Sequence, residues 1–78
     1  MKYTQYFLST RQRADRDSIQ ESWIECAVNC RDHEYVQTDG RIRRWVQVPE
    51  QEGKWLRVVL LSDGETVHNA FFDRRFKP

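Results

Sequence analysis

Arginine, tryptophan and histidine side chains recur between residues 41 and 76, on segments that also alternate between apolar and polar residues. Guanidinium groups bind phosphates with bidentate geometry, and aromatic rings stack on nucleobases with about 1–3 kcal/mol per base. A histidine beside a bound phosphate could carry a proton. These residue types therefore predict a surface for single-stranded nucleic acid. The residues that carry this prediction are His68 and Arg57 as catalytic candidates, and Arg43, Trp45, Trp55 and Arg74 as RNA-binding candidates.

The same side chains also suit a protein interface, because tryptophan, tyrosine and arginine are enriched at binding hot spots. His68 stands alone between Val67 and Asn69, where a histidine is more often a structural hydrogen-bonding residue than a catalyst. The alternative function is a non-catalytic protein-interaction module, or a homodimer, that uses the same face. RNA binding through phosphates weakens steeply with salt, whereas an aromatic protein interface is much less sensitive, so salt separates the two functions.

Cys26, Cys30 and His33 have a loose metal-ligand spacing. A structural zinc site needs a fourth ligand and the sequence offers none, so we expect no metal ion and no other cofactor. On a helix the two cysteines would lie four residues apart, where disulfide geometry is poor. They are therefore expected to be free thiols packed in the core.

The segment from residue 33 to residue 72 has the pattern of an antiparallel meander. Asp39-Gly40 and Asp63-Gly64 are two-residue hairpin signals, and Pro49 ends a run of alternating residues. The predicted strands span residues 33–38, 41–48, 55–61 and 65–72.

One helix is predicted over residues 18–30. Asp17 or Ser18 offers an N-cap, and Glu21 follows Ser18 at the spacing of a capping box. The apolar stripe of this helix contains Ile19, Trp23, Cys26 and Cys30, widened by Ile24, Ala27 and Val28.

Residues 1–13 leave two interpretations open. Tyr3, Tyr6, Phe7 and Thr10 have helical spacing, but the segment could equally start as a strand. The predicted fold is a single α+β domain over residues 1–78, in which the helix packs on one face of a four-stranded antiparallel sheet.

Side chains of a strand alternate between the two faces of a sheet, so the predicted strands carry two sets of residues. The set expected to face the helix is Val36, Ile42, Val46, Val48, Leu56, Val58, Leu60, Val67 and Phe71. The opposite set is Tyr35, Gln37, Arg43, Trp45, Gln47, Trp55, Arg57, His68 and Phe72, with Val59, Leu61 and Ala70. Arg44 falls with the core set, so either a bulge turns it outward or it pairs with an acidic group at the sheet edge.

Charge is unevenly distributed along the 78 residues. Residues 1–39 contain five Lys/Arg and seven Asp/Glu, and residues 40–78 contain eight and five, so the second half is basic although the net charge is +1. The stretch DRRFKP is either a solvated tail or a phosphate clamp formed by Arg74, Arg75 and Lys77. Met1–Thr10 lacks the apolar core of a signal peptide and no apolar run approaches a membrane span, so we expect a cytoplasmic protein with no membrane partner.

Three further stretches carry a resemblance. They are R.DR..I...WI from Arg13 to Ile24, DGRIRRW from Asp39 to Trp45, and LRVVLLSDGETVHNAFFDR from Leu56 to Arg74. Together they resemble small bacterial domains associated with the RelE/BrnT-like toxin superfamily. The resemblance implies helices on one face of an antiparallel sheet and a basic opposite face that cleaves RNA without a metal, using the RNA's own 2′-OH. It also implies a cognate antitoxin that masks this face.

By strand position, the resemblance gives Arg57 a phosphate-binding role and His68 an acid/base role. Related domains often open their first helix with a His-Ala-x-x-Arg element. The corresponding stretch here is STRQRADR, which has Ser9 or Thr10 at the place of the histidine. Arg13 and Arg16 keep the basic part of the element.

Overall fold

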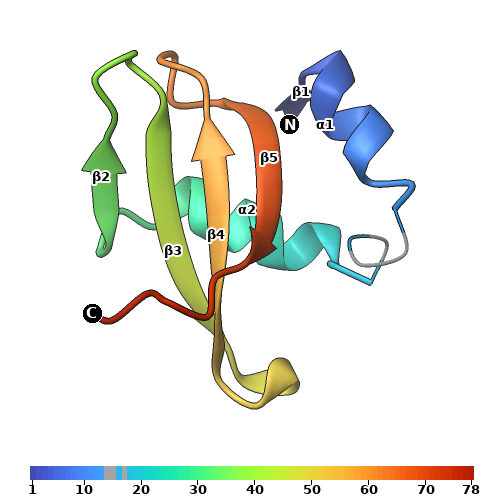
Figure 1. The fold of residues 1–78 in the computed structure, drawn as a ribbon, viewed down its shortest axis with the longest axis vertical. Coiled ribbons are helices and arrows are strands. Elements are labelled where there is room, and N and C mark those ends of the chain that lie inside the picture. Colours follow the sequence, from blue (N-terminus) through green and yellow to red (C-terminus); the bar gives the residue numbers. More distant parts are fainter. Residues whose placement is uncertain (14–15, 17) are drawn as a thin grey trace.

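The computed structural model describes residues 1–13, 16 and 18–78, and these form an α+β fold around a five-stranded sheet (Figure 1). The strand order in the sheet is β1-β5-β4-β3-β2. Along the chain, the elements of the described residues are β1 (Lys2–Tyr3), α1 (Gln5–Thr10), α2 (Glu21–Asn29), β2 (Glu34–Val36), β3 (Ile42–Val48), the 3-10 helix η1 (Pro49–Gln51), β4 (Lys54–Leu60) and β5 (Thr66–Phe72).

Strands β2 to β5 form the antiparallel meander that the two Asp-Gly turns predict. Gly40 and Gly64 adopt φ values of 92° and 71°, a conformation that glycine adopts without steric cost. The prediction of a purely antiparallel, four-stranded sheet is wrong, because β1 adds a fifth strand that pairs in parallel with β5. A two-residue strand followed by a helix thus occupies the segment that the sequence leaves open.

Helix α1 follows β1 directly and packs against β5, on the side of the sheet farthest from β2 (Figure 1). Its N-cap is Thr4, whose Oγ1 accepts a hydrogen bond from the backbone N–H of Phe7 at 3.1 Å. Phe7 and Thr10 are buried, whereas Tyr6 is 49% exposed. Among the described residues, no helix is long and apolar enough to cross a membrane.

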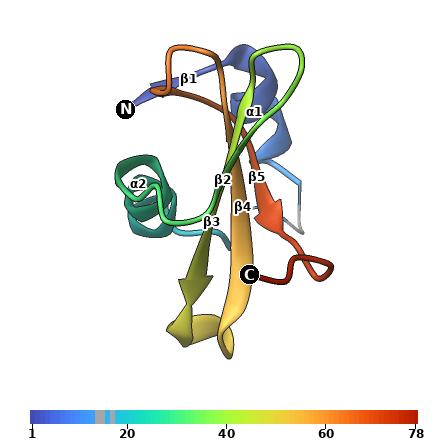
Figure 2. The same cartoon turned by 90° about the vertical axis from the view of Figure 1, so that its left-hand side faces the viewer.

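Helix α2 covers one face of the sheet, and the C-terminal residues lie against the other (Figure 2). The helix begins at Glu21 with the extended residue Gln20 as its N-cap and no side-chain cap. The predicted Ser18 cap is therefore wrong, and Asp17 lies outside the described residues. A backbone hydrogen bond of 3.2 Å from Ile19 N to Arg16 O closes a turn just before the helix, which delays its start.

The core lies between α2 and the sheet. It contains Phe7, Ile19, Trp23, Ile24, Ala27, Val46, Val48, Leu56, Val58, Leu60, Val67 and Ala70. Cys30 is partly buried against this cluster, but Cys26 is exposed, so the predicted core position of Cys26 is wrong. The buried face of α2 is centred on Trp23, Ile24 and Ala27, which turns Cys26 outward.

A β-bulge in β5 changes which residues of that strand face the core. Val59 pairs with Asn69 and Leu60 pairs with Val67, so His68 is the extra residue. The alternation is reversed beyond it, since Ala70 is buried and Phe72 packs against the core. The prediction that Phe71 faces the core and that Ala70 and Phe72 face outward is therefore wrong. Val36 also differs from the prediction, because it is 57% exposed on edge strand β2.

Arg44 keeps the core-facing position that the alternation gives it. Its side chain is only 2% exposed, and its Nε donates a hydrogen bond to Glu34 Oε1 at 2.8 Å. Its Nη1 donates to the backbone carbonyl of Val28 at 2.6 Å. The sequence left two arrangements open for Arg44, a bulge that turns it outward or a pair with an acidic group at the sheet edge. The pair with an acidic group is confirmed.

Candidate nucleic-acid interface

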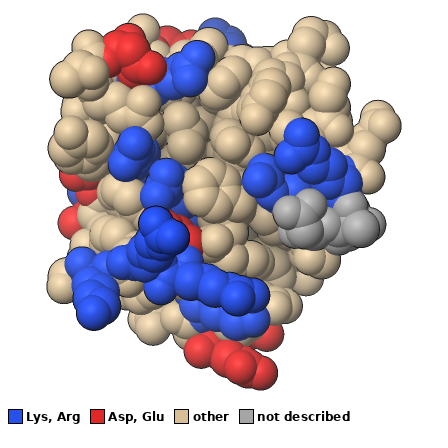
Figure 3. Space-filling view, viewed as in Figure 1, with Lys and Arg blue, Asp and Glu red and all other residues tan. Residues whose placement is uncertain are grey.

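The sheet face opposite α2, called the open face below, carries five of the predicted site residues: Arg43, Trp45, Trp55, Arg57 and His68. Trp45 and Arg57 are direct cross-strand partners on β3 and β4, and Trp55 lies two residues before Arg57 on the same strand. His68 lines one hollow together with Arg57. Figure 3 shows Lys and Arg side chains gathered on this side of the molecule. The basic residues that line hollows on or beside the open face are Arg16, Arg41, Arg43, Lys54, Arg57, Arg74 and Lys77.

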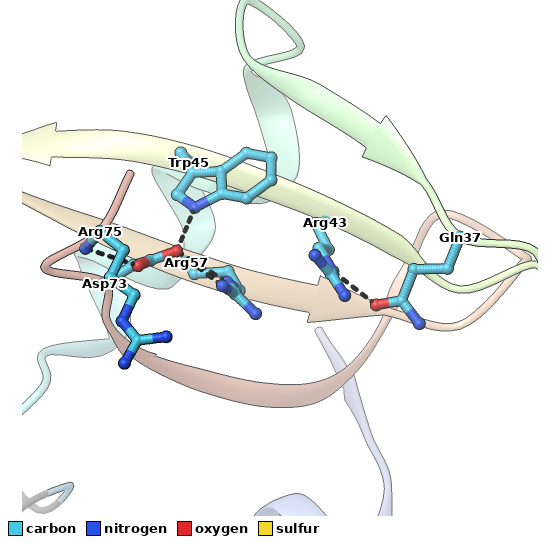
Figure 4. A network of polar contacts seen from close by, with 6 residues as sticks. All are labelled: Gln37, Arg43, Trp45, Arg57, Asp73 and Arg75. Atoms are coloured by element: carbon cyan, nitrogen blue, oxygen red, sulfur yellow. Dashed lines mark hydrogen bonds and ion pairs between the residues drawn. The ribbon is translucent and has the colours of Figure 1, made fainter. Parts of the chain in front are cut away.

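Arg57 is held in place by Asp73, the first residue after β5 (Figure 4). Asp73 Oδ2 accepts hydrogen bonds from Arg57 Nε at 3.0 Å, Arg57 Nη2 at 2.7 Å and Trp45 Nε1 at 3.0 Å. Burial alone would raise the pKa of Asp73, but the bonds from Trp45 and Arg57 outweigh it and lower the pKa below the ordinary 3.8. The guanidinium charge of Arg57 is therefore largely neutralised within the chain.

Phe76 covers the indole ring of Trp45. The two rings are stacked, with centroids 4.5 Å apart and planes 12° apart, and Trp45 is only 7% exposed. Trp55 and His33 contact the same phenylalanine at centroid distances of 5.0 and 5.6 Å. The prediction of a solvated tail is wrong for Asp73 and Phe76, while Arg74, Arg75 and Lys77 are exposed.

Arg43 lies on the open face without a carboxylate partner among the described residues. Its Nε donates to Gln37 Oε1 at 2.7 Å (Figure 4), and its guanidinium carbon lies 5.5 Å from the centroid of the Tyr35 ring. Both neighbours are neutral, so they orient the side chain and leave its charge available. Nearby, the Arg41 side chain forms an exposed ion pair with Asp39 at 3.8 Å.

His68 lies in an open hollow of about 470 Å³. The hollow is lined by Tyr6, Gln37, Arg41, Arg57, Val59, His68, Asn69 and Phe71. The imidazole stacks on Tyr6 at a centroid distance of 4.8 Å, and its Nδ1 lies 3.1 Å from Thr4 Oγ1. Burial, and secondarily the charge of Arg41, lowers the pKa of His68 below 6.5, which favours the neutral form of the ring.

The remaining predicted residues lie apart from His68. Trp55 and Arg74 line a second hollow of about 470 Å³ with Lys54 and Phe72, at the start of β4 and the end of β5. Arg43 and Trp45 line a third hollow of about 570 Å³ beside β2. Five of the six predicted residues thus share the open face, and the six are divided among three hollows, of which the second and third are both lined by Phe76.

The N-terminal segment contributes to the site in a way that the sequence did not indicate. Tyr6 reaches His68 only because β1 places α1 beside β5, a pairing that no sequence signal announced. Thr10, one of the two residues expected at the histidine position of the His-Ala-x-x-Arg element, is buried and its hydroxyl donates to the carbonyl of Phe7 at 2.9 Å. Arg16 does reach the sheet, where its Nη1 donates to Asn69 Oδ1 at 2.8 Å.

Metal-ligating side chains are not clustered in the described part of the chain, which contains no group of three or more His, Cys, Asp or Glu able to hold an ion. Both cysteines are free thiols. The chain matches no protein-family model, and comparisons with curated proteins and with solved structures find no significant similarity.

Proposed function

We propose that this protein binds single-stranded RNA on its open face. The observation that carries the proposal is Arg43, a cation oriented by Gln37 and Tyr35 with no carboxylate partner among the described residues. Arg41 is adjacent and only loosely paired, so two guanidinium groups are available for consecutive phosphates. The resemblance to RelE/BrnT-like toxins supports RNA as the ligand, and with it a toxin-like role.

A base has a stacking surface next to these cations. Tyr6 is 49% exposed and lies on the His68 ring, which forms a two-ring stack at the rim of the hollow. Aromatic stacking tolerates any base and contributes about 1–3 kcal/mol per base. Trp45, the stronger candidate by ring size, is covered by Phe76 in this conformation.

Cleavage is the catalytic form of the same proposal. A neutral His68 could take the proton of a ribose 2′-OH as that oxygen attacks the adjacent phosphorus. The bond from phosphorus to the 5′-oxygen then breaks, and the leaving oxygen takes a proton from water. Arg41, which lines the same hollow, would stabilise the charge on the phosphorane, and Arg57 would do so when its ion pair with Asp73 opens.

The test measures binding of short fluorescein-labelled single-stranded RNA by anisotropy over a range of salt concentrations. Arg43→Gln is expected to weaken binding and to reduce the salt slope by about 0.7, the value for one lost phosphate contact on a single strand. Lys2→Gln is the matched control, because it removes the same charge from a side chain that is 72% exposed and lines none of the hollows. Equal weakening by both variants, or no binding at low salt, contradicts the proposal.

A homodimer is a second candidate function, supported by edge strand β2. Trp45 N donates to His33 O at 3.1 Å and Gln37 N donates to Arg41 O at 2.7 Å. Because hydrogen-bonded positions alternate along an antiparallel strand, the backbone N–H and C=O groups of Glu34 and Val36 point away from β3, out of the sheet. A second copy of β2, antiparallel about Tyr35, would pair Glu34 with the partner's Val36 and satisfy these groups.

Sedimentation at increasing protein concentration tests the dimer. Val36→Pro removes only an outward-facing N–H and is expected to give a monomer, whereas Val36→Thr keeps the N–H and is expected to remain a dimer. A wild-type protein that stays monomeric at high concentration rules this candidate out.

A further inference from the structure

The residues that follow β5 place an anion and an aromatic ring on the open face, and these resemble the phosphate and the base of a nucleotide. Asp73 places a carboxylate on Arg57, and Phe76 places an aromatic ring on Trp45 (Figure 4 shows the carboxylate contacts). A phosphate would use the same guanidinium nitrogens, and a base would stack on the same indole.

The receiving site is shaped for a planar ring and an anion. The guanidinium carbon of Arg57 lies 4.8 Å from the centroid of Phe71 and 5.7 Å from that of Trp45, so aromatic rings hold it in position. Trp45 adds its Nε1–H as a second donor to the same anion. Arg57 is 23% exposed at its side chain, so the site lies at the surface.

The segment that occupies this site, residues 73–78, is attached to the sheet mainly through these two side chains. Among the described residues, its backbone hydrogen bond to the sheet is the one from Asp73 N to Trp55 O at 2.8 Å. Arg75 N donates to Asp73 Oδ1 at 3.0 Å, a bond inside the segment itself. Moving residues 74–78 away and turning the Asp73 side chain off Arg57 therefore breaks no strand pairing, since the backbone bond from Asp73 N to Trp55 O can remain.

We propose that residues 73–78 form an autoinhibitory strap that RNA displaces from a nucleotide subsite made by Arg57 and Trp45. This inference rests on the proposed RNA binding and extends it, because it names the second subsite and what controls access to it. Displacement exchanges the Asp73 carboxylate for a phosphate and the Phe76 ring for a base. It also leaves Arg74, Arg75 and Lys77, exposed in the strapped state, free to follow the RNA backbone.

The experiment compares RNA affinity of the full chain with that of two strap variants. Asp73→Asn and Phe76→Ala are each expected to bind short single-stranded RNA about tenfold more tightly, a change of about 1.4 kcal/mol. Glu65→Gln is the control for net charge, because Glu65 is exposed and forms an ion pair with Lys2 away from the strap. It should change the affinity less than twofold. Thermal melts by circular dichroism identify any variant that fails to fold.

A second measurement reports the strap directly. In ¹⁵N relaxation experiments, the backbone amides of residues 74–77 should be ordered in the free protein and become flexible in the RNA complex, with order parameters below about 0.6. The Trp45 indole N–H signal should shift at the same time. If neither wild type nor variants bind RNA, the proposed function fails and this inference with it. If wild type binds but the strap variants bind no more tightly and the strap stays ordered, only the strap is wrong.

Discussion

Arg44 and Glu34 form an ion pair under helix α2, with Arg44 Nε 2.8 Å from Glu34 Oε1 and the arginine side chain 2% exposed. Because Arg44 also donates to the carbonyl of Val28, one cation joins β3, β2 and the end of α2. Glu34 is 30% exposed, so solvent weakens the pair relative to a fully buried one.

We expect Glu34→Ala to lower the free energy of unfolding by about 2 kcal/mol, since it leaves a buried guanidinium with one partner fewer. Urea denaturation of Glu34→Ala, Arg44→Met and the double variant measures the coupling between the two residues. The double variant should lose less stability than the two single variants together. Additive losses within about 0.5 kcal/mol would show that the pair does not couple.

Stability should increase from acidic pH towards neutrality because of His68. The folded-state pKa of His68 lies below 6.5, so the unfolded chain binds a proton at a higher pH than the folded one. The contribution of His68 to the free energy of unfolding is therefore present above pH 6.5, the pKa in the unfolded chain. It is lost as the pH falls towards the lower pKa of the folded state. Unfolding free energies measured across this range should show a slope that His68→Gln removes. An unchanged slope in the variant would assign the effect to another group.

RNA cleavage, where it occurs, should depend on the neutral form of His68. The rate is expected to rise with pH, to level off above the depressed pKa, and to fall about 10²- to 10⁴-fold in His68→Gln. Product analysis on denaturing gels, with 2′-deoxy RNA as the uncleavable control, measures this. Thr4→Val tests positioning, since it removes the hydroxyl 3.1 Å from His68 Nδ1; because the same hydroxyl caps α1, a thermal melt of this variant must accompany the rate measurement. Cleavage that survives in His68→Gln would contradict the assigned role.

Two adjacent residues of the loop before β4 should respond in opposite directions. Glu52 has φ 60°, which side chains disfavour, so Glu52→Asn should raise the free energy of unfolding by about 0.5–1 kcal/mol. Gly53 has φ 75°, and an added Cβ would lie 3.1 Å from Gln47 Nε2, so Gly53→Ala should lower it by about 1–2 kcal/mol. Thermal unfolding of both variants decides the sign, and equal signs would contradict this account.

The meander was predictable because its turns are encoded locally. Asp39-Gly40 and Asp63-Gly64 supply the glycine conformations that tight turns need, and alternation in β3 and β4 places Trp45 and Arg57 on one face. The alternation fails at His68, because Val67 to Phe72 has apolar residues at both parities and fits two registers. Only packing against the core selects the bulge.

The sequence predicted the residue types of the candidate site, but it did not predict that Asp73 and Phe76 cover Arg57 and Trp45. Sequence alternation brings Arg57 and Trp45 together, but it carries no information on Asp73 and Phe76, which lie beyond the last strand and fold back by side-chain contacts. Likewise Tyr6 reaches His68 through a parallel strand of two residues, which is too short to produce a periodic signal.

The parallel pairing of β1 with β5 sets an order for folding during translation. Lys2 and Tyr3 leave the ribosome early, yet their sheet partners Thr66 and Val67 are among the last residues of the fold to be made. The hairpins of β2 to β4 can close as they emerge, whereas the contacts of α1 with β5 can form only once β5 exists. We therefore expect the contact of Tyr6 with His68, and with it the hollow around His68, to form only after β5 has been made.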